Sequence, residues 1–133
     1  MTQTFADSFY FLALFNPRDS AHEKAVDASR TISGLLVTTD WVLAEVADAL
    51  SDVKNRSACA SFINDLRRSP NVEIIPGSRQ TFDAGWALYQ QRPDKDCSLT
   101  DCISFAIMES RGIREALTGD HDFTQAGFQA TLV

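Results

Sequence analysis

The hydrophobic positions along the chain follow two periods, one typical of strands and one typical of helices. Short apolar or β-branched runs predict strands at residues 2–6, 35–39, 72–76, 115–119 and 130–133. The segments between them repeat at a spacing nearer 3.6 than 2, which predicts helices at residues 8–15, 19–29, 41–50, 57–68, 79–91 and 100–111. Strands separated by helices favour parallel pairing through right-handed crossovers. The pattern therefore predicts an α/β fold of three layers, with a central, mainly parallel sheet between two layers of helices.

Length and composition indicate one ordinary globular domain. The 133 residues are 44% hydrophobic and 23% charged, which matches a single domain spanning residues 1–133. No apolar run approaches the ~20 residues needed to cross a bilayer, and the first residues lack the pattern of a secretory leader. We therefore expect a cytoplasmic protein with no membrane partner. Cys59, Cys97 and Cys102 form no C-x-x-C pair, so we expect reduced thiols instead of disulfides or a zinc site.

The net charge restricts how the protein could hold nucleic acid. A formal charge of -6 argues against binding through a broad basic surface, because phosphate neutralisation needs clustered Lys and Arg. The total does not say where the acids lie, however. Acidic side chains that converge on divalent cations could still hold a phosphate through the metal.

Four acidic residues are predicted to lie beyond the carboxyl ends of the strands, where parallel sheets usually form their binding sites. Asp7 follows the first predicted strand, and Asp120 follows the fourth. Asp101 opens a helix whose N-terminus is directed toward the same end. Glu45 lies about two turns after Thr39, from where a long side chain could reach back, although an exposed helix face would also explain it. We expect the four carboxylates to converge.

The other acids have structural explanations as well. Asp7 suits the N-cap of the helix that follows it. Asp101 stands three residues after Ser98, the spacing of a capping box, and suits the helix dipole. Asp120 and Asp122 suit a turn. Capping and turn formation give no reason, however, for all of these acids to gather at one end of the sheet.

Four segments of the chain together resemble the PIN domain of VapC-type toxins. They are ADSFYFLALFNPRDSAHEKA, TTDWVLAEVADAL, SLTDCISFAIMESRGI and EALTGDHDFTQAGF. The resemblance runs from about Phe5 to Phe128 and rests on the order and spacing of the segments in combination. It implies a PIN-like fold whose acidic metal site is formed by Asp7, Glu45, Asp101 and Asp120.

The resemblance also implies roles for neighbouring residues. Asp122 would have an accessory part in the metal site, and Ser8 and Thr118 would help to hold carboxylates or water. His22 and His121 have no histidine or cysteine partner at ligand spacing, so we expect both to be non-ligands. The oxygen-only ligand set suits Mg²⁺ or Mn²⁺.

The implied activity is that of a metal-dependent endoribonuclease. Water would attack the phosphorus and leave a 5′-phosphate and a 3′-hydroxyl, with one or two metal ions stabilising the displacement. The expected partners are an RNA substrate, a cognate antitoxin protein and a second copy of the chain in a homodimer. Two alternatives stay open: a catalytically silent PIN-like scaffold that binds RNA or protein, and a nuclease of RNA maturation.

Two further sets of residues carry expectations. Basic side chains beside the Glu45 and Asp101 segments could grip the phosphate backbone, although solvated helix ends and a loop explain them equally well. These are Lys54, Arg56, Arg92 and Lys95. Large apolar side chains, including Trp41, Trp86 and Phe62, are expected to fill the core.

Overall fold

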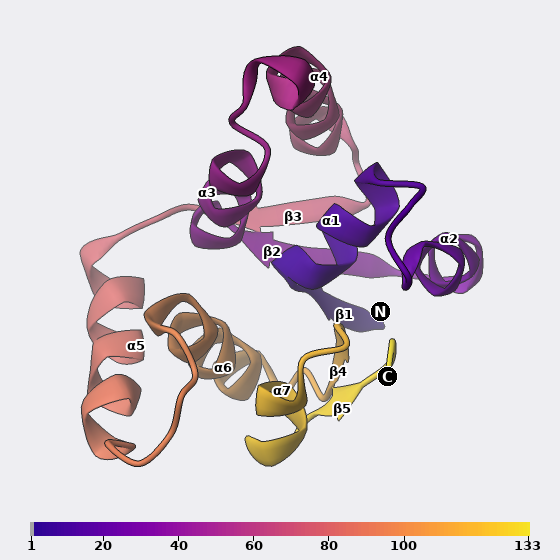
Figure 1. Cartoon of the computed structure of the whole chain (residues 1–133). Helices are drawn as coiled ribbons and strands as arrows, with labels where there is room; N and C mark the ends of the chain where they lie inside the picture. The colour runs from indigo at the N-terminus through magenta and orange to yellow at the C-terminus, as the bar shows by residue number, and fades with distance from the viewer. Residues whose placement is uncertain (1) are drawn as a thin grey trace.

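The computed structural model describes residues 2–133 and contains seven helices and five strands in that range (Figure 1). The strands are β1 (Gln3–Ala6), β2 (Leu35–Thr39), β3 (Val72–Ile75), β4 (Glu115–Leu117) and β5 (Gln129–Ala130). The helices are α1 (Ser8–Phe15), α2 (His22–Thr31), α3 (Asp40–Ala49), α4 (Val53–Arg68), α5 (Arg79–Gln91), α6 (Leu99–Arg111) and α7 (His121–Gln125). None of these helices is long and apolar enough to span a membrane.

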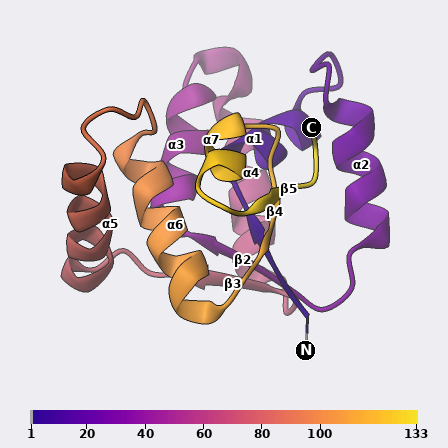
Figure 2. The same ribbon diagram turned by 90° about the horizontal axis from the view of Figure 1, so that it is seen from below.

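The five strands form one sheet in the order β3-β2-β1-β4-β5, and every neighbouring pair is parallel. Phe5 of β1 pairs with Val37 of β2 on one side and Ala116 of β4 on the other. Along the chain, β2 and β3 are added to the sheet on one side of β1, and β4 and β5 are then added on the other side. Right-handed crossovers consequently put α1 to α4 on one face and α5 to α7 on the other. Figure 2 shows β1 and β4 between α2 and α6, and the predicted three-layer α/β fold is confirmed.

Each face of the sheet is covered by apolar helix surfaces. Phe5 and Val37 are fully buried in neighbouring strands, as strands covered on both faces require. Phe11 of α1 is fully buried, and so is Ile103 of α6, on the other face. Phe123 packs edge-on against Phe105, with ring centroids 4.9 Å apart, and anchors α7 to α6. The core therefore holds the loops at the strand ends in fixed positions.

Several element boundaries differ from those predicted, for local reasons. The second helix begins at His22 instead of residue 19 because the Asp19 carboxylate accepts the backbone N–H of Ala21 in the preceding turn. Helix α4 begins at Val53, before the predicted start at residue 57, over a polar stretch with little apolar periodicity. The last strand is Gln129–Ala130, shorter and earlier than the predicted 130–133. Helix α7 was not predicted, since its five residues contain one apolar position.

The prediction that Trp86 fills the core is wrong. Its side chain is 42% exposed, whereas Trp41 and Phe62 are partly buried against the core as expected. The reason is the close approach of α5 to α6 at Gly85, where an added Cβ would lie 2.2 Å from Ile103 Cγ1. Gly85 faces α6, so the next residue along the helix is turned about 100° away. Cys59, Cys97 and Cys102 are free thiols, as predicted.

Candidate metal centre

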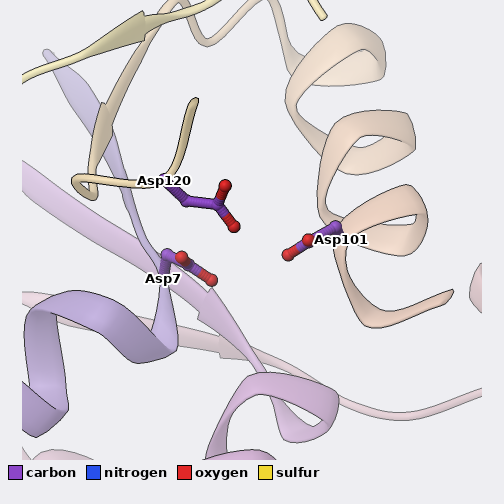
Figure 3. Close-up of side chains that lie close together, drawn as sticks. All are labelled: Asp7, Asp101 and Asp120. Carbon is purple, nitrogen blue, oxygen red and sulfur yellow. The ribbon is translucent and has the colours of Figure 1, made fainter. Parts of the chain in front are cut away.

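Three carboxylates meet at the carboxyl edge of the sheet. Asp7 directly follows β1, Asp120 lies three residues after the end of β4, and Asp101 stands in the first turn of α6. One oxygen from each lies within 4.8 Å of the others (Figure 3). The strands β1 and β4 are neighbours where the direction of chain building reverses, and binding sites of open α/β sheets form at such a point. The topology therefore brings Asp7 together with Asp120, which is more than a hundred residues away in the chain.

Asp7 is the most deeply buried of the three, at 3% exposure. The Thr118 hydroxyl donates a 2.8 Å hydrogen bond to its Oδ2, while Oδ1 is buried without a hydrogen-bond partner in the described chain. Asp7 occupies the N-cap position of α1 but its side chain makes no capping bond, so the capping explanation does not account for it. Burial raises the pKa of Asp7 to about 6, with the charges of Glu45 and Asp120 adding to the effect and the Thr118 bond opposing it.

Asp101 is oriented by the cap of its own helix. The Ser98 hydroxyl accepts the backbone N–H of Asp101 at 3.0 Å, which begins α6 and leaves the Asp101 carboxylate directed at the other two acids. The side chain is 7% exposed. Burial raises the pKa of Asp101 to about 7, and the charges of Asp7, Asp120 and Glu45 raise it further. Ser98 thus performs the capping that local sequence also allowed for Asp101.

Asp120 has a structural role and a place in the cluster at once. Its Oδ1 accepts the backbone N–H of Asp122 at 2.9 Å and caps α7. Its own N–H donates to the Thr118 hydroxyl at 3.1 Å, so Thr118 links Asp7 to Asp120. The intervening Gly119 packs against Phe9, and an added Cβ would lie 2.5 Å from that ring. The pattern Thr-Gly-Asp therefore meets three separate requirements: a hydroxyl that links two acids, a residue with no side chain beside Phe9, and a carboxylate that caps α7. The requirement at Gly119 was not predicted from the sequence.

Glu45 lies beside the three-aspartate group without belonging to it. It is half-buried on α3, and the Ser8 hydroxyl donates a 2.5 Å hydrogen bond to its Oε1. Its charge contributes to the raised pKa values of both Asp7 and Asp101, so it is an electrostatic neighbour of the group. The structure thus gathers three of the four predicted acids tightly and places the fourth at their side.

The remaining residues singled out in the sequence lie farther out. Asp122 is half-buried in the first turn of α7, outside the group, and burial together with the charges of Asp120 and Asp96 raises its pKa. His22 Nδ1 lies 2.8 Å from the Ala13 carbonyl oxygen and joins α2 to α1. His121 is exposed. Neither histidine is part of the carboxylate group.

The four basic residues are divided between two places. Lys54 and Arg56 are exposed in the first turn of α4. Arg92 follows the end of α5, and Lys95 lies in the loop before α6. The second pair is thus the one connected directly to the helix that carries Asp101.

The carboxylate group has the properties of a divalent cation site. Two buried acids with raised pKa values repel one another when ionised, and a cation removes that repulsion. The unpartnered Oδ1 of Asp7 is a buried acceptor that a cation would satisfy. The three ligand atoms that the group offers are carboxylate oxygens, which suit hard cations better than zinc or copper. The residues present therefore fit a bound divalent metal ion.

Comparison with known proteins places the chain in a family. Residues 4–129 match the family model described as PIN domain, and the chain belongs to the PIN domain family. It is 28% identical over 125 residues to the 23S rRNA-specific endonuclease VapC20 of Mycobacterium tuberculosis, which covers 93% of this chain and 94% of that protein. The chain is a homologue of the VapC-type toxins.

Solved structures give the same result for the fold. The crystal structure of Mycobacterium tuberculosis VapC20, described as a sarcin-ricin loop cleaving toxin, has a TM-score of 0.87 at 26% identity and covers 94% of this chain and 95% of that one. VapBC2 from Rickettsia felis, bound to a DNA fragment from its promoter, has a TM-score of 0.68 at 12% identity and covers 97% and 96%. FitAcB from Neisseria gonorrhoeae has a TM-score of 0.69 at 14% identity and covers 96% and 94%. The last two support the fold alone.

Proposed function

We propose that the chain is a metal-dependent endoribonuclease and the toxin of a toxin-antitoxin pair. The observation that carries this proposal is the group of three carboxylates, with oxygens within 4.8 Å of one another, at the switch point of a PIN fold. Homology to VapC20, an endonuclease specific for 23S rRNA, supports RNA as the substrate class. Ribosomal RNA is the first target to test for the same reason.

Asp7, Asp101 and Asp120 would hold Mg²⁺ or Mn²⁺, with Glu45 completing the site and Asp122 in an accessory position. A bound divalent cation lowers the pKa of water and neutralises charge on the phosphate that is cleaved. The chain itself orients the carboxylates. Thr118 fixes Oδ2 of Asp7 and leaves Oδ1 available, which is the arrangement a ligand needs.

We propose a second task for Glu45, beside the metal-binding aspartates. Its bond from Ser8 fixes Oε1 and leaves the other carboxylate oxygen available to accept a proton from the attacking water. Removing an aspartate should therefore affect the reaction differently from removing Glu45. Removal of an aspartate weakens metal binding, whereas removal of Glu45 mainly slows cleavage.

The proposed partners follow from the same homology. Structural neighbours of the chain include VapBC and FitAB assemblies, which supports a cognate antitoxin as a protein partner. We further propose a homodimer, and an action in the cytoplasm, where cellular RNA is available to a toxin. Lys54, Arg56, Arg92 and Lys95 are candidates for phosphate contacts.

The test is cleavage of a fluorescent RNA pool by purified protein in Mg²⁺, Mn²⁺ or chelator. Asp7→Asn and Asp120→Asn should each abolish cutting, and Asp65→Asn on the exposed face of α4 serves as the charge-matched control. A DNA pool of the same sequences distinguishes ribonuclease from general nuclease activity. If folded protein that is free of co-purified inhibitor cuts no RNA and binds no Mn²⁺ in calorimetry, the enzyme proposal fails and a silent binding scaffold takes its place.

A further inference from the structure

A hollow of about 520 Å³ lies beside the proposed metal centre, between the end of α5 and the start of α6. Aromatic rings from α5 and charged groups from the following loop line it together. The lining residues include Trp86, Tyr89, Arg92, Lys95, Asp96 and Ser98. The approach of α5 to α6 at Gly85 turns Trp86 outward, and the proposed metal site does not use the exposed aromatic rings.

The aromatic rings form a ladder along α5. The rings of Phe82 and Trp86 lie 6.3 Å apart at an interplanar angle of 14°, and those of Trp86 and Tyr89 lie 5.2 Å apart at 10°. Trp86 is 42% and Tyr89 46% exposed, and within residues 2–133 no other aromatic side chain is exposed. Nearly parallel, exposed rings offer a surface on which another planar ring can stack.

The charges at the hollow suit a group that is planar and carries an anion. Arg92 has no carboxylate within ion-pair distance in the part of the chain that the structure describes. Lys95 lies 3.9 Å from Asp94 in an exposed pair, which stabilises little and can be exchanged for a phosphate. Asp94 and Asp96 together balance the charges of Arg92 and Lys95, so the hollow does not offer a broad basic surface. Arg92 is left able to contact a single phosphate beside a stacked ring.

The hollow and the carboxylate group lie on two sides of the same helical turn. Ser98 lines the hollow, and its hydroxyl accepts the backbone N–H of Asp101. Cys102, the residue after Asp101, also lines it. A single-stranded nucleic acid with one phosphate at the three aspartates can therefore place an adjacent nucleotide in the hollow.

We propose that this hollow binds an unpaired nucleobase of the RNA substrate beside the phosphate that is cleaved. The base stacks on the Trp86 and Tyr89 rings, and Arg92 contacts the backbone phosphate. This inference rests on the proposed ribonuclease function and adds the mode of substrate recognition. It also assigns a role to the two large rings that α5 exposes next to the helix that carries Asp101.

The experiment measures binding of a labelled single-stranded RNA of ~8 nucleotides by fluorescence anisotropy, in chelator so that no cleavage occurs. Trp86→Leu should lower the affinity roughly ten-fold, and Trp86→Phe should retain most of it because a ring remains. Arg92→Ala should reduce the slope of log affinity against log salt by about 0.7, one phosphate contact on a single strand, whereas Trp86→Leu should leave that slope unchanged. Arg30→Ala, an exposed and ion-paired arginine on α2, should change neither quantity.

Two results would overturn the inference. One is wild-type RNA affinity in Trp86→Leu. The other is a change confined to oligomeric state in light scattering, which would make this face a contact between two copies of the chain. Cleavage assays separate the failure of this inference from that of the proposed function. If Asp7→Asn abolishes cutting while Trp86→Leu retains the wild-type kcat/KM, the base site alone is wrong; if wild-type protein cuts no RNA, the enzyme proposal is wrong.

Discussion

Replacing Asp101 with Asn should stabilise the metal-free protein at alkaline pH. Asp101 is 7% exposed, and its pKa is raised from 3.8 to about 7 by burial and by the charges of Asp7, Asp120 and Glu45. A carboxyl whose folded-state pKa is raised contributes stability that is fully present below its unfolded pKa and lost as pH rises through the folded value. The cost of ionising Asp101 is therefore largest above about pH 7.

The magnitude follows from the shift of about three pKa units. At ~1.4 kcal/mol per unit, the raised pKa of Asp101 lowers the free energy of unfolding by about 4 kcal/mol at about pH 8. At about pH 5 the loss is about 2 kcal/mol, because the carboxyl is still protonated in the folded protein but ionised in the unfolded chain. Asparagine carries no charge but is still a polar group in a buried position, so it should recover about half of these amounts. A gain of about 2 kcal/mol in a domain of this size raises Tm by roughly 5–10 °C.

The assay is thermal and urea unfolding in chelator at both pH values. Asp65→Asn, which removes an exposed carboxylate 2.9 Å from Arg68, is the control and should change stability by less than ~0.5 kcal/mol. Saturating Mn²⁺ should stabilise the wild type more than Asp101→Asn, because the variant has lost a ligand. A variant that is less stable than the wild type at alkaline pH in chelator would refute the view that burial and neighbouring charges make ionised Asp101 destabilising.

Three further outcomes test the local architecture. Gly119→Ala should lower the free energy of unfolding by about 1–3 kcal/mol, because its Cβ would lie 2.5 Å from the Phe9 ring. Phe9→Leu in the same chain should recover part of that loss. In differential scanning fluorimetry, the control Gly77→Ala should keep the wild-type Tm, because its Cβ would have only ordinary contacts. Ser8→Ala removes the donor to Glu45 and should lower kcat with little change in Mn²⁺ affinity, to be checked by cleavage kinetics beside calorimetry. Mn²⁺ affinity in calorimetry should rise from about pH 5 to 8 with proton release into the buffer, since two buried aspartates have pKa values raised to about 6 and about 7; a pH-independent affinity would contradict this.

Much of the fold was predictable because hydrophobic period and local turn chemistry agree with it. Each predicted strand overlaps an observed one, and alternating strands and helices led to a parallel sheet. Helix α7 was missed because five residues are too short to display a period. The exposure of Trp86 was missed because the sequence does not state how closely α5 approaches α6 at Gly85.

The carboxylate site, too, was predictable from the sequence only in part. Local sequence placed Asp7 and Asp120 after strands and Asp101 at the start of a helix, since these positions follow from periodicity and capping alone. It also allowed each acid to be only a cap or a turn residue. The burial of Asp7, the free position of its Oδ1 and the raised pKa values depend on contacts between residues far apart in the chain.

The sequence alone thus determined which residue types stand at the ends of which elements, because helix and strand preferences act over a few neighbouring positions. Tertiary structure decided that β1 and β4 lie side by side, that Thr118 links two of the acids, and that Glu45 stays just outside their group. Distances between distant segments depend on how closely layers pack and where the sheet reverses direction. Those are properties of the whole fold, and at this site they turn separate acids into one group that fits a metal ion.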